Sequence, residues 1–152
     1  MSGFIEADGH FTIRVSTGLN RSLSRRIACT FELVQRQFDI SGESTYPLLS
    51  QFSNFLSSRL TETKRKSKFP QYRVRTTSLQ GNLILKDYLK KYPLFSSKYL
   101  DYLDFLEVLE FFIKKEHYNN IKKIIEIKSR MNNLRTSFNW DHLTAFPKVF
   151  LD

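Results

Sequence analysis

The sequence predicts one α/β domain of the α+β type, in which helices cover one side of a four-stranded antiparallel sheet. Segments where apolar and polar residues alternate, as they do in half-buried strands, occur in two pairs. Each pair follows a segment whose apolar residues recur at helical spacing, and further helical segments come after the second pair. The 152 residues, of which 41% are hydrophobic, suffice for one such domain with its own core.

The first pair of strands follows a short helix, which we expect to end at Asp8 or at the helix-breaking Gly9. Two alternating segments, residues 10–16 and 25–34, flank a stretch rich in Gly, Asn and Ser that is typical of a hairpin loop. Their apolar face holds Phe11, Ile13, Val15, Ile27, Cys29, Phe31 and Leu33. The opposite, polar face is expected to point outward and holds Thr12, Arg14, Ser16, Arg26, Ala28, Thr30 and Glu32.

A second helix and a second hairpin are predicted next. The helix spans residues 46–60, with Pro47 near its first position. We expect the first strand of the hairpin around residues 59–66 and the second over residues 72–77. The outward positions of the second strand are Arg73, Arg75 and Thr77.

Three further helices are predicted over residues 79–91, 97–115 and 119–134. The first ends before Tyr92-Pro93, because proline disfavours a helical residue ahead of it. The apolar positions expected to face inward from the other two are Leu100, Leu103, Leu106, Leu109, Phe112, Ile113, Ile121, Ile124, Ile125 and Met131. We place the domain at residues 1–134. Residues 135–152 form an aromatic tail that we expect to pack on the domain or on a partner.

The composition favours a nucleic-acid partner. Twenty-four Lys and Arg against 15 Asp and Glu give a formal net charge of +9 and attract polyanions. A ribosome-associated or merely basic protein would share this balance. The single cysteine excludes an internal disulfide framework and a cysteine-built zinc site, and the three histidines match no metal-ligand spacing. No apolar run is long enough for a membrane span, and residues 1–9 resemble no signal or transit peptide, so no membrane partner is expected.

Residues 3–9, Gly-Phe-Ile-Glu-Ala-Asp-Gly, followed by His10-Phe11, resemble the defining motif of the LAGLIDADG homing endonucleases and intron maturases without its first Leu-Ala. The resemblance continues through residues 31–35, 92–94 and 97–101 and covers about residues 1–131. It implies an αββαββα core, a saddle-shaped four-stranded antiparallel sheet and extra C-terminal helices. The motif occurs once, so we expect either a homodimer or one half of a two-motif protein, with the C-terminal half as the candidate.

The motif itself suggests how two copies form a site. Gly3 and Ala7 are small residues on one helix face and let a second such helix approach closely, and Phe4 is assigned to the same interface. Pairing then places two Asp8 carboxylates side by side, where their repulsion favours a divalent cation. The hard oxygen ligands suggest Mg²⁺. Glu6 is expected to contact backbone or a basic neighbour instead of metal.

The resemblance further implies metal-dependent hydrolysis of both strands of double-stranded DNA. Asp8 would be the metal ligand. Gln35 matches a family position near the active-site water, and Lys98 matches a basic position near the scissile phosphate. The outward residues of the strands would read the major groove, namely Thr12, Arg14, Ser16, Arg26, Thr30, Glu32, Arg73, Arg75 and Thr77. Phosphate contacts are expected from Asn20, Arg21, Arg25, Lys64, Arg65, Lys66 and Lys68.

An alternative function belongs to a different class. The same basic fold could act as an RNA-binding intron maturase, or as a catalytically silent module on ribosomal RNA, since both occur in the wider family. Asp8 is needed for cleavage alone, which favours the endonuclease. The abundance of Phe, Ile, Lys and Asn suggests an AT-rich organellar genome, and we expect a mitochondrial protein.

Overall fold

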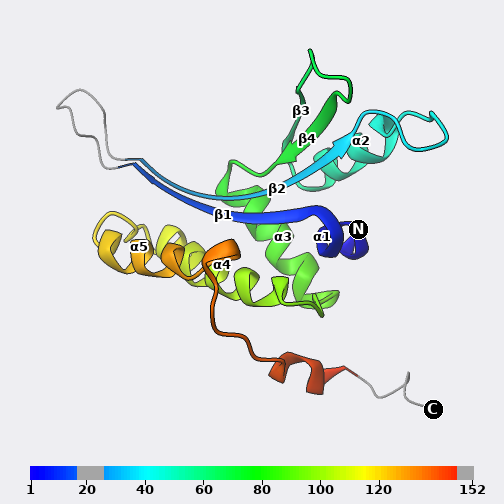
Figure 1. Ribbon diagram of the computed structural model, residues 1–152. Coiled ribbons are helices and arrows are strands. Elements are labelled where there is room, and N and C mark those ends of the chain that lie inside the picture. Colours follow the sequence, from blue (N-terminus) through cyan, green and yellow to red (C-terminus); the bar gives the residue numbers. More distant parts are fainter. Residues whose placement is uncertain (17–25, 147–152) are drawn as a thin grey trace.

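The computed structural model describes residues 1–16 and 26–146 and has the predicted order of elements (Figure 1). Helix α1 is followed by two strands, helix α2, two more strands and three helices, with two short 3₁₀ helices after them. The bounds are α1 Ser2–Asp8, β1 Gly9–Ser16, β2 Arg26–Arg36, α2 Tyr46–Phe55, β3 Arg59–Thr63, β4 Gln71–Arg75, α3 Leu79–Lys91, α4 Lys98–Ile113, α5 Ile121–Ser129, η1 Asn132–Leu134 and η2 Asp141–Ala145.

The four strands form one antiparallel sheet in the order β1-β2-β4-β3, which confirms the predicted fold class. In Figure 1 the helices α3, α4 and α5 lie on one side of the long strands β1 and β2, and no helix formed by the described residues covers the other side of these two strands. The apolar and polar faces of β1 and β2 are divided as the alternation predicts, with one exception. Thr30, predicted to be accessible on the outward face, is only 8% exposed, because β1 flanks it on one side and the residues that follow β4 flank it on the other. The sheet therefore has a buried face and an open one.

Aromatic residues from opposite layers meet in the core. The ring of Phe11 on β1 lies 5.3 Å from that of Phe31 on β2, and 5.2 Å and 5.5 Å from Phe105 and Tyr102 on α4 (ring centroids). All four side chains are buried. Large aromatic rings in tilted contact contribute strongly to such a core, so this cluster fixes α4 against the first hairpin.

The junction between α1 and β1 is built around Gly9, but for a different reason than the sequence suggested. We expected Gly9 to end the helix through backbone freedom, whereas its φ of −69° and ψ of 145° are open to any residue. A Cβ at this position would lie 2.7 Å from the Ile5 carbonyl oxygen and 2.8 Å from the Phe31 ring. Glycine is therefore required here by close packing.

Helix α2 is shorter than predicted and ends at Phe55. Ser57 has a positive φ of 44°, which turns the chain, and Leu60 belongs to β3, where it pairs with Val74 of β4. The helical periodicity of the leucines continues by chance into a strand residue that faces the same core. This explains why the sequence pattern extended the helix too far.

The inward positions of α4 and α5 are partly corrected. Leu103 and Ile113 are 42% and 38% exposed, while Tyr102, Phe105 and Val108 take the buried positions of α4. On α5, Ile125 is exposed, and Ile127, which the prediction omitted, is buried with Ile124 and Met131. Because the sequence of α4 is almost continuously apolar, spacing alone does not show which face of the helix is buried, and it wrongly selected Leu103 as an inward position. The last predicted helix also ends at Ser129 and gives way to η1.

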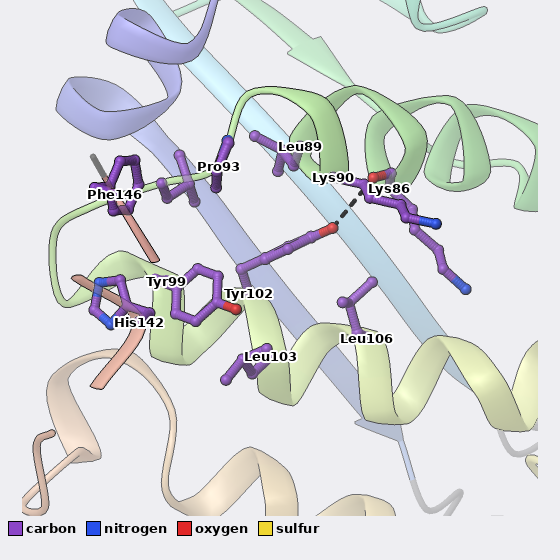
Figure 2. Close-up of a pocket in the computed structure, with 11 residues that line it drawn as sticks. Lys86, Leu89, Lys90, Pro93, Tyr99, Tyr102, Leu103, Leu106, His142 and Phe146 are labelled. Atoms are coloured by element: carbon purple, nitrogen blue, oxygen red, sulfur yellow. Dashed lines mark hydrogen bonds between the residues drawn. The ribbon is translucent and has the colours of Figure 1, made fainter. Parts of the chain in front are cut away.

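The segment after α5 is held against α4. Arg135 pairs with Asp101 and Asp104 at 2.8 Å and 2.5 Å, and the three side chains are at most 15% exposed. Further on, the His142 ring stacks on Tyr99 at 4.4 Å and lies within hydrogen-bond distance of the Phe95 carbonyl oxygen. This segment closes one side of an apolar cavity of about 380 Å³ between α3 and α4 (Figure 2). The last residues of the predicted tail, 147–152, lie outside the described residues.

Candidate functional site

Asp8 and Gln35 come together at the end of the motif helix. Asp8 is the last residue of α1 and is exposed. The pairing of Gly9 with Leu33 places Gln35 two residues further along β2, and its Nε2 donates a hydrogen bond of 2.6 Å to Asp8 Oδ2. The strand register thus brings a side-chain donor to the carboxylate from 27 residues away. Gln35 holds the orientation of the Asp8 side chain.

Lys98, at the start of α4, lies at the same end of α1. Its Nζ donates to the Ile5 carbonyl oxygen at 3.0 Å, in the last turn of the helix, where a positive charge is favourable. Partial burial lowers the pKa of Lys98, and the charges of Glu6, Asp8 and Asp101 oppose this change. The structure therefore gathers Asp8, Gln35 and Lys98 from three elements around one helix end.

Glu6 anchors the motif helix to the connection between α3 and α4. Its carboxylate accepts hydrogen bonds from the Phe95 and Ser96 backbone N–H groups and from the Ser96 hydroxyl. Contact with backbone was expected, and these hydrogen bonds fix the helix to the residues that precede α4. The acidic residue of the motif that remains free for other chemistry is Asp8.

One face of α1 has no covering element within the described part of the chain. Gly3, Phe4 and Ala7 are exposed, and a Cβ added at Gly3 would meet nothing within 4 Å. Phe4 is 38% exposed and has one edge packed on Phe52 of α2, with ring centroids 5.6 Å apart. The backbone of α1 is accessible at Gly3 and Ala7 to a second helix.

The residues around Asp8 could provide only part of a cation site. Asp8 and Gln35 line a cleft of about 510 Å³ that also includes Arg36 and Gln71. Across residues 1–16 and 26–146, no group of three or more His, Cys, Asp or Glu side chains could hold a metal ion. A hard divalent cation needs several oxygen ligands, so Asp8 fits such an ion only if further oxygens come from a second chain or from a ligand.

The open face of the sheet carries most of the residues predicted to bind nucleic acid. By register, Thr12 faces Thr30, Arg14 faces Ala28, Ser16 faces Arg26, and Glu32 lies between His10 and Arg75. The same face includes residues that the prediction left out, namely His10, Val34, Arg36, Arg59, Thr61, Thr63 and Gln71. Five of them were missed because β3 was poorly defined in the sequence, β2 extends further than expected and β4 begins earlier.

Among the residues predicted to contact bases, Thr77 lies outside the strands. Strand β4 ends at Arg75, and Thr76 is fully buried, with its hydroxyl donating to Asn82 Oδ1 at 2.5 Å. The burial of Thr76 continues the alternation, but strand pairing has already ended, and the exposed Thr77 lines a pocket together with Arg14 and Arg75. Asn20, Arg21 and Arg25, predicted to contact phosphate, lie outside the described residues.

The open face is basic. The strands contribute Arg14, Arg26, Arg36, Arg59, Arg73 and Arg75 to it, and Glu32 is the acidic side chain that the described strand residues place on this face. A positive surface beside an exposed carboxylate can hold a polyanion next to a metal-ligating group. No helix of the described chain has the length and apolar character needed to cross a membrane.

Comparison with known proteins points to one family. The family described as LAGLIDADG endonuclease matches residues 1–109. The chain is 32% identical over 113 residues to the probable intron-encoded DNA endonuclease aI1 of Mycosarcoma maydis, covering 73% of this chain and 93% of that protein. It is 26% identical to the intron-encoded DNA endonuclease aI3 of Saccharomyces cerevisiae, over 94% of this chain and 39% of the relative.

A solved structure has the same fold over a similar range. The chain superposes on the I-LtrWI LAGLIDADG homing endonuclease bound to target DNA with a TM-score of 0.72 and 24% identity, covering 89% of this chain and 44% of that one. The chain thus spans nearly all of the Mycosarcoma relative but less than half of the yeast relative and of I-LtrWI.

Proposed function

The chain belongs to the LAGLIDADG endonuclease family, and from this membership we propose that it is a sequence-specific endonuclease of double-stranded DNA in which Asp8 supplies one carboxylate of a paired cleavage site. The observation that carries the proposal is the position of Asp8. It is exposed at the end of α1, between the uncovered face of that helix and the open basic face of the sheet.

Pairing through α1 completes the site. A second motif helix, from another copy of this chain or from a second domain of the same family, packs against Gly3, Phe4 and Ala7. Glycine and alanine permit close backbone approach, and the space over Gly3 is open. Two Asp8-type carboxylates then lie next to each other, where their repulsion is relieved by a shared divalent cation.

The residues of the pair fit Mg²⁺, a small cation that is usually bound through one or two carboxylates together with waters and phosphate oxygens. When bound, Mg²⁺ would stabilise negative charge on the reacting phosphate and lower the pKa of water. Asp8 of each half would hold the ion. Gln35 keeps the Asp8 carboxylate oriented through its 2.6 Å hydrogen bond, and the ammonium group of Lys98 supplies positive charge at the same helix end.

The open face of the sheet binds the DNA. A two-stranded ribbon fits the major groove, where base edges present distinguishable hydrogen-bonding patterns. Side chains of β1, β2 and β4 on this face, with Thr77 at its rim, would contact bases, and the exposed basic turn between β3 and β4 would contact phosphate without reading sequence. Two relatives are named intron-encoded DNA endonucleases, which supports the proposal that the gene of this chain also lies in an intron. A mitochondrial location remains a prediction.

The test combines size-exclusion chromatography and light scattering with a duplex DNA library that has a randomised central segment. We expect two 18.0 kDa chains, or one chain and its partner domain, to bind enriched duplexes, and cleavage to occur with Mg²⁺ but not with Ca²⁺. A folded chain that enriches no duplex, alone or with a second family domain, would contradict the proposal. If the chain bound intron RNA instead, the maturase alternative would replace it.

A further inference from the structure

Glu32 is an acidic side chain on a face whose other charged strand residues are arginines and His10. It lies directly opposite Arg75 in the register of β2 and β4. Arg75 donates to the same oxygen, Glu32 Oε2, from Nε at 3.0 Å and from Nη2 at 2.6 Å. Arg73, on the same strand, approaches that oxygen with Nε at 3.7 Å. The Glu32 carboxylate is therefore already paired with arginine side chains in the absence of DNA.

The contact uses one edge of the Arg75 guanidinium and leaves another edge available. A guanidinium has five N–H donors in a planar fork. Nε and Nη2 point to Glu32, so both N–H groups of Nη1 and the second N–H of Nη2 are directed away from it. The donors on that outer edge match the two acceptors, O6 and N7, that a guanine presents in the major groove. The side chain of Arg75 is 26% exposed, so its outer edge can be reached.

Charge explains why Arg75 needs this partner. Arg59 lies opposite Arg75 on its other side, in β3, and Arg73 follows two residues before it in β4. Like charges that face each other across strands repel, so Arg75 alone would turn away from its neighbours. Burial by itself would raise the pKa of Glu32, but the hydrogen bond and charge of Arg75, with Arg73 and His10, hold its pKa below the ordinary value. Glu32 therefore stays ionised at neutral pH.

We infer that Glu32 is a positioning residue that holds Arg75 in the orientation needed to read a guanine, and that Glu32 does not itself read a base. The inference rests on the proposed function and refines the sequence-based expectation, in which Glu32 itself reads the major groove. Fixing an arginine before binding lowers the entropy lost when its base contact forms. Specificity at one base pair then depends on two residues from neighbouring strands.

The test compares base preferences in the same randomised duplex library for the wild type and for two variants, R75K and E32Q. R75K keeps the charge but loses the planar fork, so it should lose guanine enrichment at one position. E32Q should lose enrichment at that same position, by about tenfold, since this is the scale of discrimination of one bidentate contact. Its affinity for unselected duplexes should not fall, because a negative charge that repels phosphate has been removed.

The matched control is Glu62→Gln, which makes the same substitution on β3 at a residue paired with Arg65 at 3.1 Å and absent from the open face. This variant should keep the wild-type preference, and thermal unfolding should show that all variants are folded. The inference is overturned if E32Q retains the guanine preference, or if it loses a position different from that lost by R75K. If the wild type enriched no sequence, the proposed function itself would be wrong.

Discussion

Substituting Gly9 by alanine should damage the junction that positions Asp8. The added Cβ would lie 2.7 Å from the Ile5 carbonyl oxygen, 2.8 Å from Phe31 Cε2 and 3.0 Å from Ile5 Cα. Two of these atoms belong to the backbone of α1, and the third to a fully buried ring in the aromatic cluster. None of them is the far end of a flexible side chain, so either α1 or Phe31 must move.

The size of the effect follows from the geometry. The backbone conformation of Gly9 is open to alanine, so no cost arises from φ, and alanine restricts the unfolded chain by about 0.4–1 kcal/mol in favour of folding. Forcing an extra carbon into a packed site costs about 1–3 kcal/mol, and the backbone contacts here favour the upper end. We therefore expect the free energy of unfolding to fall by about 1–2 kcal/mol, as the difference of these two effects.

Urea denaturation followed by circular dichroism measures this change, and Gly3→Ala provides the matched control. At Gly3 a Cβ meets nothing, so alanine should stabilise the monomer by about 0.5–1 kcal/mol through helix propensity. The same variant should weaken pairing by placing a methyl group on the free face of α1. If Gly9→Ala is as stable as the wild type, or if both variants lose similar stability, the account of the α1–β1 junction is wrong.

Three further predictions concern charge and burial. Arg135→Ala should lower the free energy of unfolding by about 3 kcal/mol in urea titrations, at the lower end of the cost of breaking a buried ion pair. Asp101 loses its charged partner in a mostly buried position, whereas Asp104 keeps Arg130. Burial raises the pKa of the Cys29 thiol, so Cys29 should resist a thiol reagent in the folded protein and react at the normal rate in urea. The pKa of Glu32 is lower in the folded chain than in the unfolded chain, so its ion pair stabilises above the unfolded pKa and is lost as pH falls through the folded pKa. The stability difference between the wild type and E32Q should accordingly shrink on acidification; a difference that is constant with pH would contradict this.

The sequence predicted the strands and their faces well because alternation is a direct consequence of strand geometry. Phe11, Ile13 and Phe31 are buried and Arg14 is exposed, as the pattern indicates. The helix ends were predicted less well. The end of α2 depends on the turn at Ser57 and on the pairing of Leu60 with Val74, and long-range pairing leaves no signal in a local pattern.

The grouping of Asp8, Gln35 and Lys98 in the structure depends on strand register and on the docking of α4, which residue spacing does not specify. The sequence supplied these positions through family resemblance, and their roles in catalysis remain proposals. The pairing of Glu32 with Arg75 could have been suspected from opposite charges on neighbouring strands. The register of β2 against β4, however, comes only from the structure.

The most direct test of the central claim is cleavage of an enriched duplex by Asp8→Asn in Mg²⁺, beside Asp87→Asn, which makes the same change at an exposed position on α3. Both variants should bind the duplex. Asp8→Asn should leave both DNA strands uncut while Asp87→Asn cuts them as the wild type does. If Asp8→Asn cut the duplex at the wild-type rate, Asp8 would not supply the carboxylate of the cleavage site and the proposed function of this helix end would be wrong.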